Sequence, residues 1–146
     1  LNSFAEVIEC RHAPRYLREL YGETRHELSW LAGKTVAALS GIAVPQGFEN
    51  FLRDLGANVV HCERYADHHR YASDEIITAI NRAADLGADA LITTEKDAVR
   101  FSHLSETAVP VYFLRVEIEI LKGAENFQDA VAHICFQTKL RRRRRK

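Results

Sequence analysis

Long apolar runs are absent from this chain of 146 residues. None approaches the roughly 20 residues that cross a bilayer. Charged residues interrupt positions 1–20, so no signal peptide is predicted. Cysteine is scarce: Cys10, Cys62 and Cys135 lie far apart, form no C-x-x-C pair and are odd in number. This usage favours a reducing, cytoplasmic setting in which the cysteines act as small buried hydrophobic residues.

What is present is typical of one soluble domain, with 47% apolar and 27% charged residues. The net charge of zero hides an asymmetry, because Arg141–Lys146 contribute six of the 20 basic residues. The remaining body has 14 basic against 20 acidic residues, a net charge of −6, which argues against a nucleic-acid partner. We expect residues 139–146 to be a disordered, solvated basic tail. Contact of that tail with anionic lipid or nucleic acid is the alternative.

Short apolar runs alternate with helical periods from residue 34 onward. Strands are predicted at 36–40, 58–61, 89–93 and 109–114, and a half-exposed segment at 115–120. One helix is predicted to begin at Pro45, and three others are predicted to be capped by Ser73, Thr94 and Asn126. A strand is predicted at 7–10, followed by an irregular connection. This order implies right-handed βαβ units, hence a three-layer αβα fold with a mainly parallel, Rossmann-like sheet in a single domain. The predicted divisions are a strand and linker segment at 1–33, the α/β domain at 34–138 and the tail.

Two polar segments follow predicted strands directly. Asp67-His68-His69 comes after the second strand, and Thr94-Glu95-Lys96-Asp97 comes after the third. In parallel sheets the functional loops lie at the carboxyl ends of the strands. We therefore expect both segments to open on the same edge of the sheet.

The Asp67-His68-His69 segment is open to three interpretations. Imidazole and carboxylate are good metal ligands, although adjacent residues rarely point the same way, so at most two would share one ion. A histidine beside a carboxylate can instead take or relay a proton near neutral pH. The third interpretation is a polar loop whose histidines only cap strand and helix ends.

The second segment also has a functional and a structural interpretation. Lys96 could meet a phosphate group as a point charge. In the structural interpretation Thr94 and Asp97 cap a short helix, while Glu95 and Lys96 fix the loop.

A partial phosphate-binding motif occurs at Gly33-Lys34-Thr35. A P-loop requires G-x-x-x-x-G-K-[ST] between a strand and a helix. Here Leu28 stands at the first glycine position, and the motif precedes a strand. We therefore expect no cradle for a nucleotide triphosphate at this point.

Four segments in register resemble one family. They are LAGKTVAALSGIAVP at 31–45, FENFLRDLG at 48–56, YADHHRYAS at 65–73 and LITTEKDAVR at 91–100. Together they are similar to the C-terminal half of tetraacyldisaccharide 4′-kinases, the lipid A pathway kinases of Gram-negative bacteria. The resemblance runs from about Val7 to the last helix.

That resemblance implies transfer of the ATP γ-phosphate to the 4′-hydroxyl of an acylated disaccharide lipid, with Mg²⁺, by a peripheral enzyme at the cytoplasmic face of the inner membrane. It implies that an N-terminal P-loop domain, beyond this chain, holds ATP and Mg²⁺ and supplies a catalytic aspartate. The present half would contribute His68 as that aspartate's partner, with Asp67 as a further catalytic candidate. His69, Thr94, Glu95, Lys96 and Asp97 are supporting candidates.

The sequence differs from the family at some positions, and two other functions are open. Arg100 stands where the family usually has lysine, and the chain begins at Leu1 rather than methionine, as a fragment would. Such a fragment is expected to be soluble and inactive alone. A metal-dependent phosphoesterase of the Asp-His-His type is one alternative, but it needs further metal ligands such as Asp-x-Asp, which the chain lacks. The other is a non-catalytic α/β binding module recruited through its basic tail.

Overall fold

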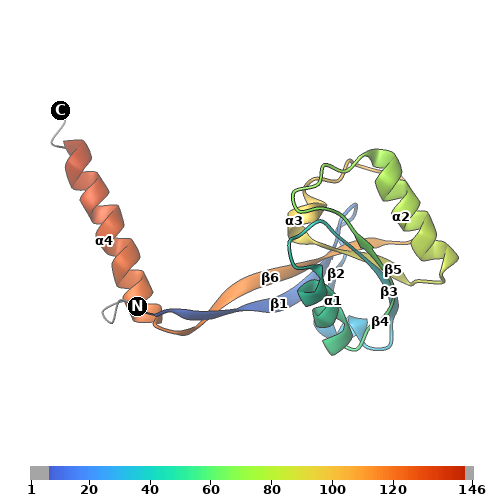
Figure 1. Ribbon diagram of the computed structural model, residues 1–146, viewed down its shortest axis with the longest axis horizontal. Helices are drawn as coiled ribbons and strands as arrows, with labels where there is room; N and C mark the ends of the chain where they lie inside the picture. The colour runs from blue at the N-terminus through green and yellow to red at the C-terminus, as the bar shows by residue number, and fades with distance from the viewer. Residues whose placement is uncertain (1–6, 144–146) are drawn as a thin grey trace. The chain divides into compact units, whose positions relative to one another are not determined.

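The computed structural model describes the backbone of residues 7–143 and the side chains of residues 7–135. Two compact units divide the chain (Figure 1). Pro14–Val116 form the larger unit, and Leu1–Ala13 with Glu117–Lys146 form the smaller one.

The described elements alternate between strands and helices along most of the chain. In order they are β1 (Glu9–Glu19), β2 (Arg25–Glu27), the 3-10 helix η1 (Leu28–Leu31), β3 (Thr35–Ser40), α1 (Pro45–Asp54), β4 (Asn58–Arg64), α2 (Ser73–Asp85), β5 (Ala90–Thr94), α3 (Glu95–Ala98), β6 (Val111–Lys122) and α4 (Ala124–Arg143). The strands form one sheet in the order β2-β1-β6-β5-β3-β4. Strand β3 runs parallel to β4 and β5, and β5 runs parallel to β6, whereas β1 and β2 form an antiparallel edge. The predicted mainly parallel sheet is confirmed.

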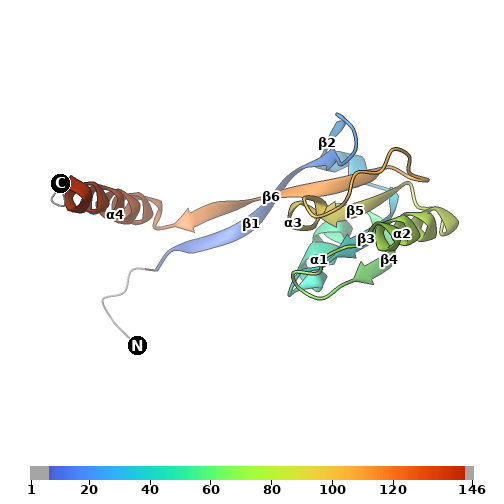
Figure 2. The ribbon, with the colours of Figure 1, turned by 90° about the horizontal axis from the view of Figure 1, so that it is seen from above.

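Helices cover both faces of the sheet within the larger unit. On one face Phe48 and Leu52 of α1 pack with Val36 and Ile92 of the strands. On the other, the buried side of α2, which includes Ile76 and Ile80, packs against the alternate strand residues. Figures 1 and 2 show α1 and α2 on opposite sides of the strands. Side chains alternate across a strand, so each strand contributes to both cores, and the αβα layering follows.

Local sequence signals position most of these elements. Pro45 begins α1, as predicted. Gly56 follows the end of α1 with φ +87°, a conformation that glycine adopts without steric cost. The cap of α2 differs from the prediction: Ser73 is its first residue, and the backbone N–H of Ala72 donates to Glu75 Oε2 at 2.8 Å. The carboxylate of Glu75 therefore caps this helix.

Several secondary-structure predictions at the two ends of the chain are wrong. Residues 11–19 are not part of an irregular connection, because β1 continues to Glu19 and the buried side chain of Leu17 joins the core. The predicted strand at 109–114 and the half-exposed segment after it are present, but they form one continuous strand, Val111–Lys122. Helix α4 begins at Ala124, before the predicted cap at Asn126, and its backbone remains helical to Arg143. The predicted disorder of the basic tail falls on residues whose side chains, and for 144–146 also the backbone, lie outside the described ones.

Cysteine burial was also predicted wrongly. Cys10 and Cys135 are exposed, and Cys62 is only half-buried. Both exposed cysteines belong to the smaller unit, where the apolar side chains of Phe127, Val131 and Ile134 on α4 are exposed as well. Among the described residues, no helix is both long enough and apolar enough to span a membrane.

Candidate functional site

The two polar segments meet at one edge of the sheet, as predicted. The Lys96 Nζ of α3 lies 2.7 Å from Asp67 Oδ1 in the loop that follows β4. Arg100, just beyond α3, places a guanidinium nitrogen 3.3 Å from His68 Nδ1. All four residues belong to the larger unit. The parallel pairing of β3 with β4 and β5 accounts for the meeting, since it carries the ends of β4 and β5 to the same edge.

Asp67 accepts two hydrogen bonds. Besides Lys96, the backbone N–H of His68 donates to Asp67 Oδ1 at 3.0 Å. The hydrogen bond from Lys96 is the main cause that lowers the pKa of this carboxyl, and the hydrogen bond from the His68 backbone also lowers it. A carboxylate that stays ionised in this way is a weak proton acceptor. Asp67 is thus better suited to fixing the loop than to removing a proton.

His68 is the residue with the most unusual backbone. Its φ is +63°, the only positive φ outside glycine in the described residues. Its side chain is 72% exposed, and Nε2 lies 3.6 Å from Asp67 Oδ2, too far for a hydrogen bond. A guanidinium can only donate, so a hydrogen bond from Arg100 requires an acceptor lone pair on Nδ1. The exposed Nε2 makes no hydrogen bond within the described residues.

His69 is held quite differently from its neighbour. Its Nε2 lies 3.0 Å from Glu75 Oε2. Its ring stacks on Tyr65 with centroids 4.6 Å apart and meets Tyr71 edge-on at 5.0 Å. The hydrogen bond from the Ala72 backbone lowers the pKa of Glu75 most, and the one from His69 contributes next. The two adjacent histidines separate into a packed one, His69, and an exposed one, His68.

The α3 segment is built as its structural interpretation predicted. Thr94 Oγ1 accepts from the backbone N–H of Asp97 at 3.1 Å and donates to Asp97 Oδ2 at 2.7 Å. Glu95 binds Arg115 Nη1 at 2.6 Å, which joins α3 to β6. Asp97 is completely buried, and its Oδ2 also accepts from the backbone N–H of Gly41 at 3.0 Å. The segment therefore connects the ends of β3, β5 and β6.

A small polar cluster surrounds Gly41 at the end of β3. A Cβ at Gly41 would lie 2.5 Å from the Tyr71 hydroxyl and 3.3 Å from Asp97 Oδ1, so only glycine fits. Arg100 Nη1 lies 3.8 Å from the same Asp97 oxygen. Burial raises the pKa of the Tyr71 hydroxyl, and the charge of Asp97 raises it further. Asp97, a supporting candidate, is thus the centre of a buried cluster beneath the exposed His68.

Three members of this cluster were not predicted from the sequence. They are Gly41, Tyr71 and Arg100. Arg100 was noted solely as a departure from lysine. For Gly41 the usable signal is its position directly after a buried strand, where a close approach of backbone to a side chain requires glycine.

Gly33-Lys34-Thr35 offers no phosphate cradle. The backbone N–H groups of Gly33 and Lys34 donate to the carbonyls of Gly56 and Leu31, at 2.9 and 3.0 Å. The N–H of Thr35 donates to Asp89 Oδ2 at 2.9 Å, and Lys34 Nζ lies 3.7 Å from the same carboxylate. Since a P-loop binds phosphate through such free N–H groups, this segment does not fit ATP.

Metal ligands are not grouped in the part of the chain that the structure describes. No three side chains of histidine, cysteine, aspartate or glutamate lie close enough together there to hold an ion. The donors of the Asp-His-His segment are divided instead: Asp67 binds Lys96, and His69 binds Glu75. The segment as it stands therefore does not fit Mg²⁺.

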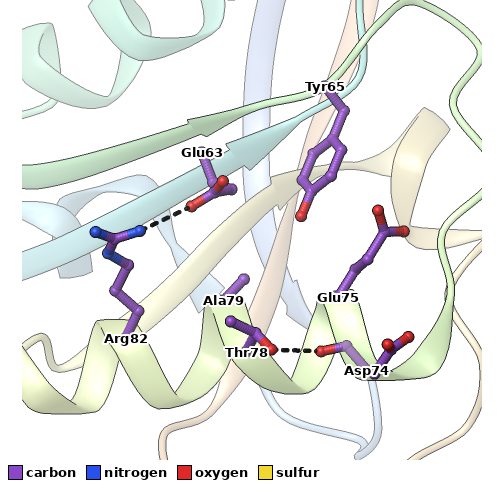
Figure 3. Close-up of a pocket in the computed structure, with 7 residues that line it drawn as sticks. All are labelled: Glu63, Tyr65, Asp74, Glu75, Thr78, Ala79 and Arg82. Carbon is purple, nitrogen blue, oxygen red and sulfur yellow. Dashed lines mark hydrogen bonds and ion pairs between the residues drawn. The ribbon is translucent and has the colours of Figure 1, made fainter.

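A shallow pocket lies beside the candidate site, between β4 and α2 (Figure 3). It is lined by Glu63, Tyr65, Asp74, Glu75, Thr78, Ala79 and Arg82. Its polar groups mostly contact one another: Arg82 lies 4.0 Å from Glu63, and the Thr78 hydroxyl donates to the Asp74 carbonyl at 2.7 Å. The pocket adds no reactive group to those of the sheet edge.

Comparison with known proteins gives a consistent result. The family model described as tetraacyldisaccharide-1-P 4′-kinase matches residues 2–135. Tetraacyldisaccharide 4′-kinases of Anaeromyxobacter dehalogenans and Syntrophus aciditrophicus are 39% and 35% identical, over 86% and 82% of this chain. The chain spans only about a third of these relatives, 34% and 32% of their lengths.

A solved structure is similar as well. It is the apo form of LpxK from Aquifex aeolicus in complex with ATP, with a TM-score of 0.49 and 18% identity over 86% of this chain and 36% of that one. The resemblance seen in the four sequence segments is confirmed by the family model, which covers nearly the whole chain. The chain belongs to the tetraacyldisaccharide-1-phosphate 4′-kinase family.

Proposed function

We propose that this chain is the C-terminal part of a kinase that transfers the γ-phosphate of ATP to the 4′-hydroxyl of a tetraacyldisaccharide 1-phosphate in lipid A synthesis. The observation that supports it most is the sheet edge at which Lys96 and Arg100 hold Asp67 and His68. The family match supplies the reaction class. The enzyme would act as a peripheral protein at the cytoplasmic face of the inner membrane, where its lipid substrate lies.

ATP and Mg²⁺ belong, in this proposal, to the part of the kinase outside this chain. The N–H groups of Gly33-Lys34-Thr35 are already used, and the described residues group no metal ligands. We propose that a P-loop domain contributes the nucleotide site and that the present segment completes the active site. The chain alone would then be inactive.

His68 is the proposed catalytic residue of this segment. Phosphoryl transfer to an alcohol depends on positioning, on charge stabilisation and on a base for the hydroxyl proton. An exposed Nε2–H is suited to donate to a carboxylate base on the facing domain, which orients that base and shares its proton. Asp67 would support His68 by holding the loop, and His69 would act only through packing.

The phosphoesterase alternative is less well supported. Such an enzyme needs carboxylates and histidines that surround two metal ions. In the described part of the chain Asp67 and His69 already bind other side chains, and no third ligand joins them. No structural observation favours a purely non-catalytic binding module either.

The proposal is tested by phosphate transfer in a kinase that contains this segment together with a P-loop domain. We expect mass spectrometry to show that the tetraacyldisaccharide 1-phosphate gains one phosphoryl group when Mg-ATP is present. Deleting the segment should abolish the product while leaving Mg-ATP binding intact. Product formation at an undiminished rate without the segment would contradict its role in catalysis.

A further inference from the structure

We propose that Arg100 is a positioning residue that fixes the ring of His68 with its proton on Nε2. This inference rests on the proposed function, since it explains how His68 is made ready to meet a carboxylate. It adds a residue to the site, and it makes a claim about the imidazole that is testable without any kinase assay.

The contact between Arg100 and His68 determines which ring nitrogen carries the proton. Arg100 Nη2 lies 3.3 Å from His68 Nδ1. A guanidinium is a donor only and stays charged at every physiological pH, so Nδ1 must be the acceptor. The ring is then neutral, and its remaining nitrogen, Nε2, carries the proton. Without Arg100 nothing in the described residues would bind Nδ1 of a side chain that is 72% exposed.

The guanidinium of Arg100 also lies beside the buried carboxylate of Asp97. Its side chain is 26% exposed, and Nη1 is buried 3.8 Å from Oδ1 of the fully buried Asp97. The other oxygen of Asp97 is held by the Gly41 backbone and by Thr94. The guanidinium therefore lies between a buried carboxylate and an exposed imidazole. A fixed donor of this kind restricts both the rotamer and the tautomer of His68.

Lys96 holds Asp67, the neighbour of His68, as Arg100 holds the His68 ring. Lys96 lies in α3 and Arg100 in the turn just beyond it, and they reach Asp67 and His68 respectively. Asp67 fixes the backbone N–H of His68, whereas Arg100 fixes its ring. Together Asp67 and Arg100 hold His68 in a left-handed backbone conformation, which is strained for a residue other than glycine.

Lysine at position 100 is the informative substitution. It keeps a positive charge near Asp97 and can still donate one hydrogen bond, but it lacks the planar fork that reaches Asp97 and His68 at once. Arg100→Leu removes both contacts. Arg70→Leu is the matched control, because Arg70 is an exposed loop arginine that makes no hydrogen bond or ion pair within the described residues.

The first test uses this chain alone and reads the ring nitrogens of His68 by long-range ¹H–¹⁵N NMR near pH 8. We expect Nδ1 of the wild type to resonate as a hydrogen-bonded, unprotonated nitrogen. In Arg100→Leu the signal should move towards that of an unbonded imidazole nitrogen, in Arg100→Lys it should move less, and in Arg70→Leu it should stay in place. An unchanged Nδ1 signal in a folded Arg100→Leu variant would overturn the proposal.

The second test separates this inference from the proposed function. In a kinase that contains this segment, Arg100→Leu should lower kcat by about 10-fold or more, because it misplaces His68. The KM for ATP and the KM for the lipid substrate should change little. Arg100→Lys should recover most of the loss. If His68→Ala is inactive but Arg100→Leu turns over normally, Arg100 is not a positioning residue and the proposed function stands. If both turn over normally, the role of His68 fails, and this inference fails with it.

Discussion

Lys96 and Asp67 form an ion pair of 2.7 Å between residues 29 positions apart in the sequence. The pair connects the short helix that follows β5 to the loop that follows β4. It is also the principal cause of the lowered pKa of Asp67. The part of the loop that carries His68 is therefore held by α3 as well as by the packing of His69.

Removing this pair should loosen the loop while the core stays folded. In Lys96→Met we expect faster amide hydrogen exchange at residues 66–70 and an almost unchanged Tm, because exposed ion pairs contribute little to global stability. Lys34→Met is the control, since Lys34 pairs with Asp89 at the opposite edge of the sheet. Equal exchange of the loop in both variants would show that Lys96 does not order it.

Acidification should release the same loop. The folded-state pKa values of Asp67 and Glu75 lie below their ordinary values of 3.8 and 4.5. Their contacts therefore stabilise the loop fully above those ordinary values, and this contribution is lost as pH falls through the lowered folded values. We expect the side-chain carboxyl ¹³C resonances of Asp67 and Glu75 to titrate with midpoints below 3.8 and 4.5, respectively. A midpoint at or above the ordinary value for either carboxyl would contradict this assignment.

Gly41→Ala should damage the buried cluster. Its Cβ would lie 2.5 Å from the Tyr71 hydroxyl, whose ring is packed edge-on against Phe101 with centroids 4.7 Å apart. We expect a loss of about 1–3 kcal/mol in the free energy of unfolding, measured by urea denaturation. Gly47→Ala is the control, because Gly47 is exposed in α1 with nothing within 4 Å of an added Cβ. It should gain about 0.5–1 kcal/mol as a helix residue. Equal stability of the two variants would contradict the close approach at Gly41.

Mg-ATP should bind this chain weakly or not at all. The N–H groups of Gly33, Lys34 and Thr35 all donate within the protein, so none is free for phosphate. Isothermal titration calorimetry of the chain with Mg-ATP provides the measurement. Micromolar affinity would contradict the assignment of nucleotide to another part of the kinase.

The alternation of strands and helices was predictable because glycine, proline and capping residues mark most boundaries between residues 35 and 98. The pattern also placed both polar loops at one edge, which Lys96 and Asp67 confirm. Residues 11–33 were not predictable in the same way. The long β1 is mostly exposed, so its apolar period is weak, and its partner β6 lies about 100 residues away. Only Leu17 and Ala13 mark its buried side.

The sequence predicted which residues form the candidate site, but not the separate role of each one. Residue type and spacing do not distinguish His68 from His69, since adjacent side chains look equivalent until the backbone is known, and only the family resemblance favoured His68. The positive φ of His68 turns its ring outward, while Tyr65, Tyr71 and Glu75 enclose His69. The role of Arg100 depends on Asp97 and His68 being close in space, which sequence spacing alone does not reveal.

We propose that His68, rather than His69, is catalytic, and one paired measurement separates the two histidines. In a kinase that contains this segment, kcat and Tm should be measured for His68→Ala and His69→Ala. We predict that His68→Ala lowers kcat by about 10²–10⁴-fold, the usual contribution of general acid–base catalysis, with little change in the KM for ATP or in Tm. His69→Ala should lower Tm, because it removes ring packing and the contact with Glu75, and should retain most of its turnover. Near-normal turnover in His68→Ala, or a large fall in its Tm together with lost activity, would contradict the account.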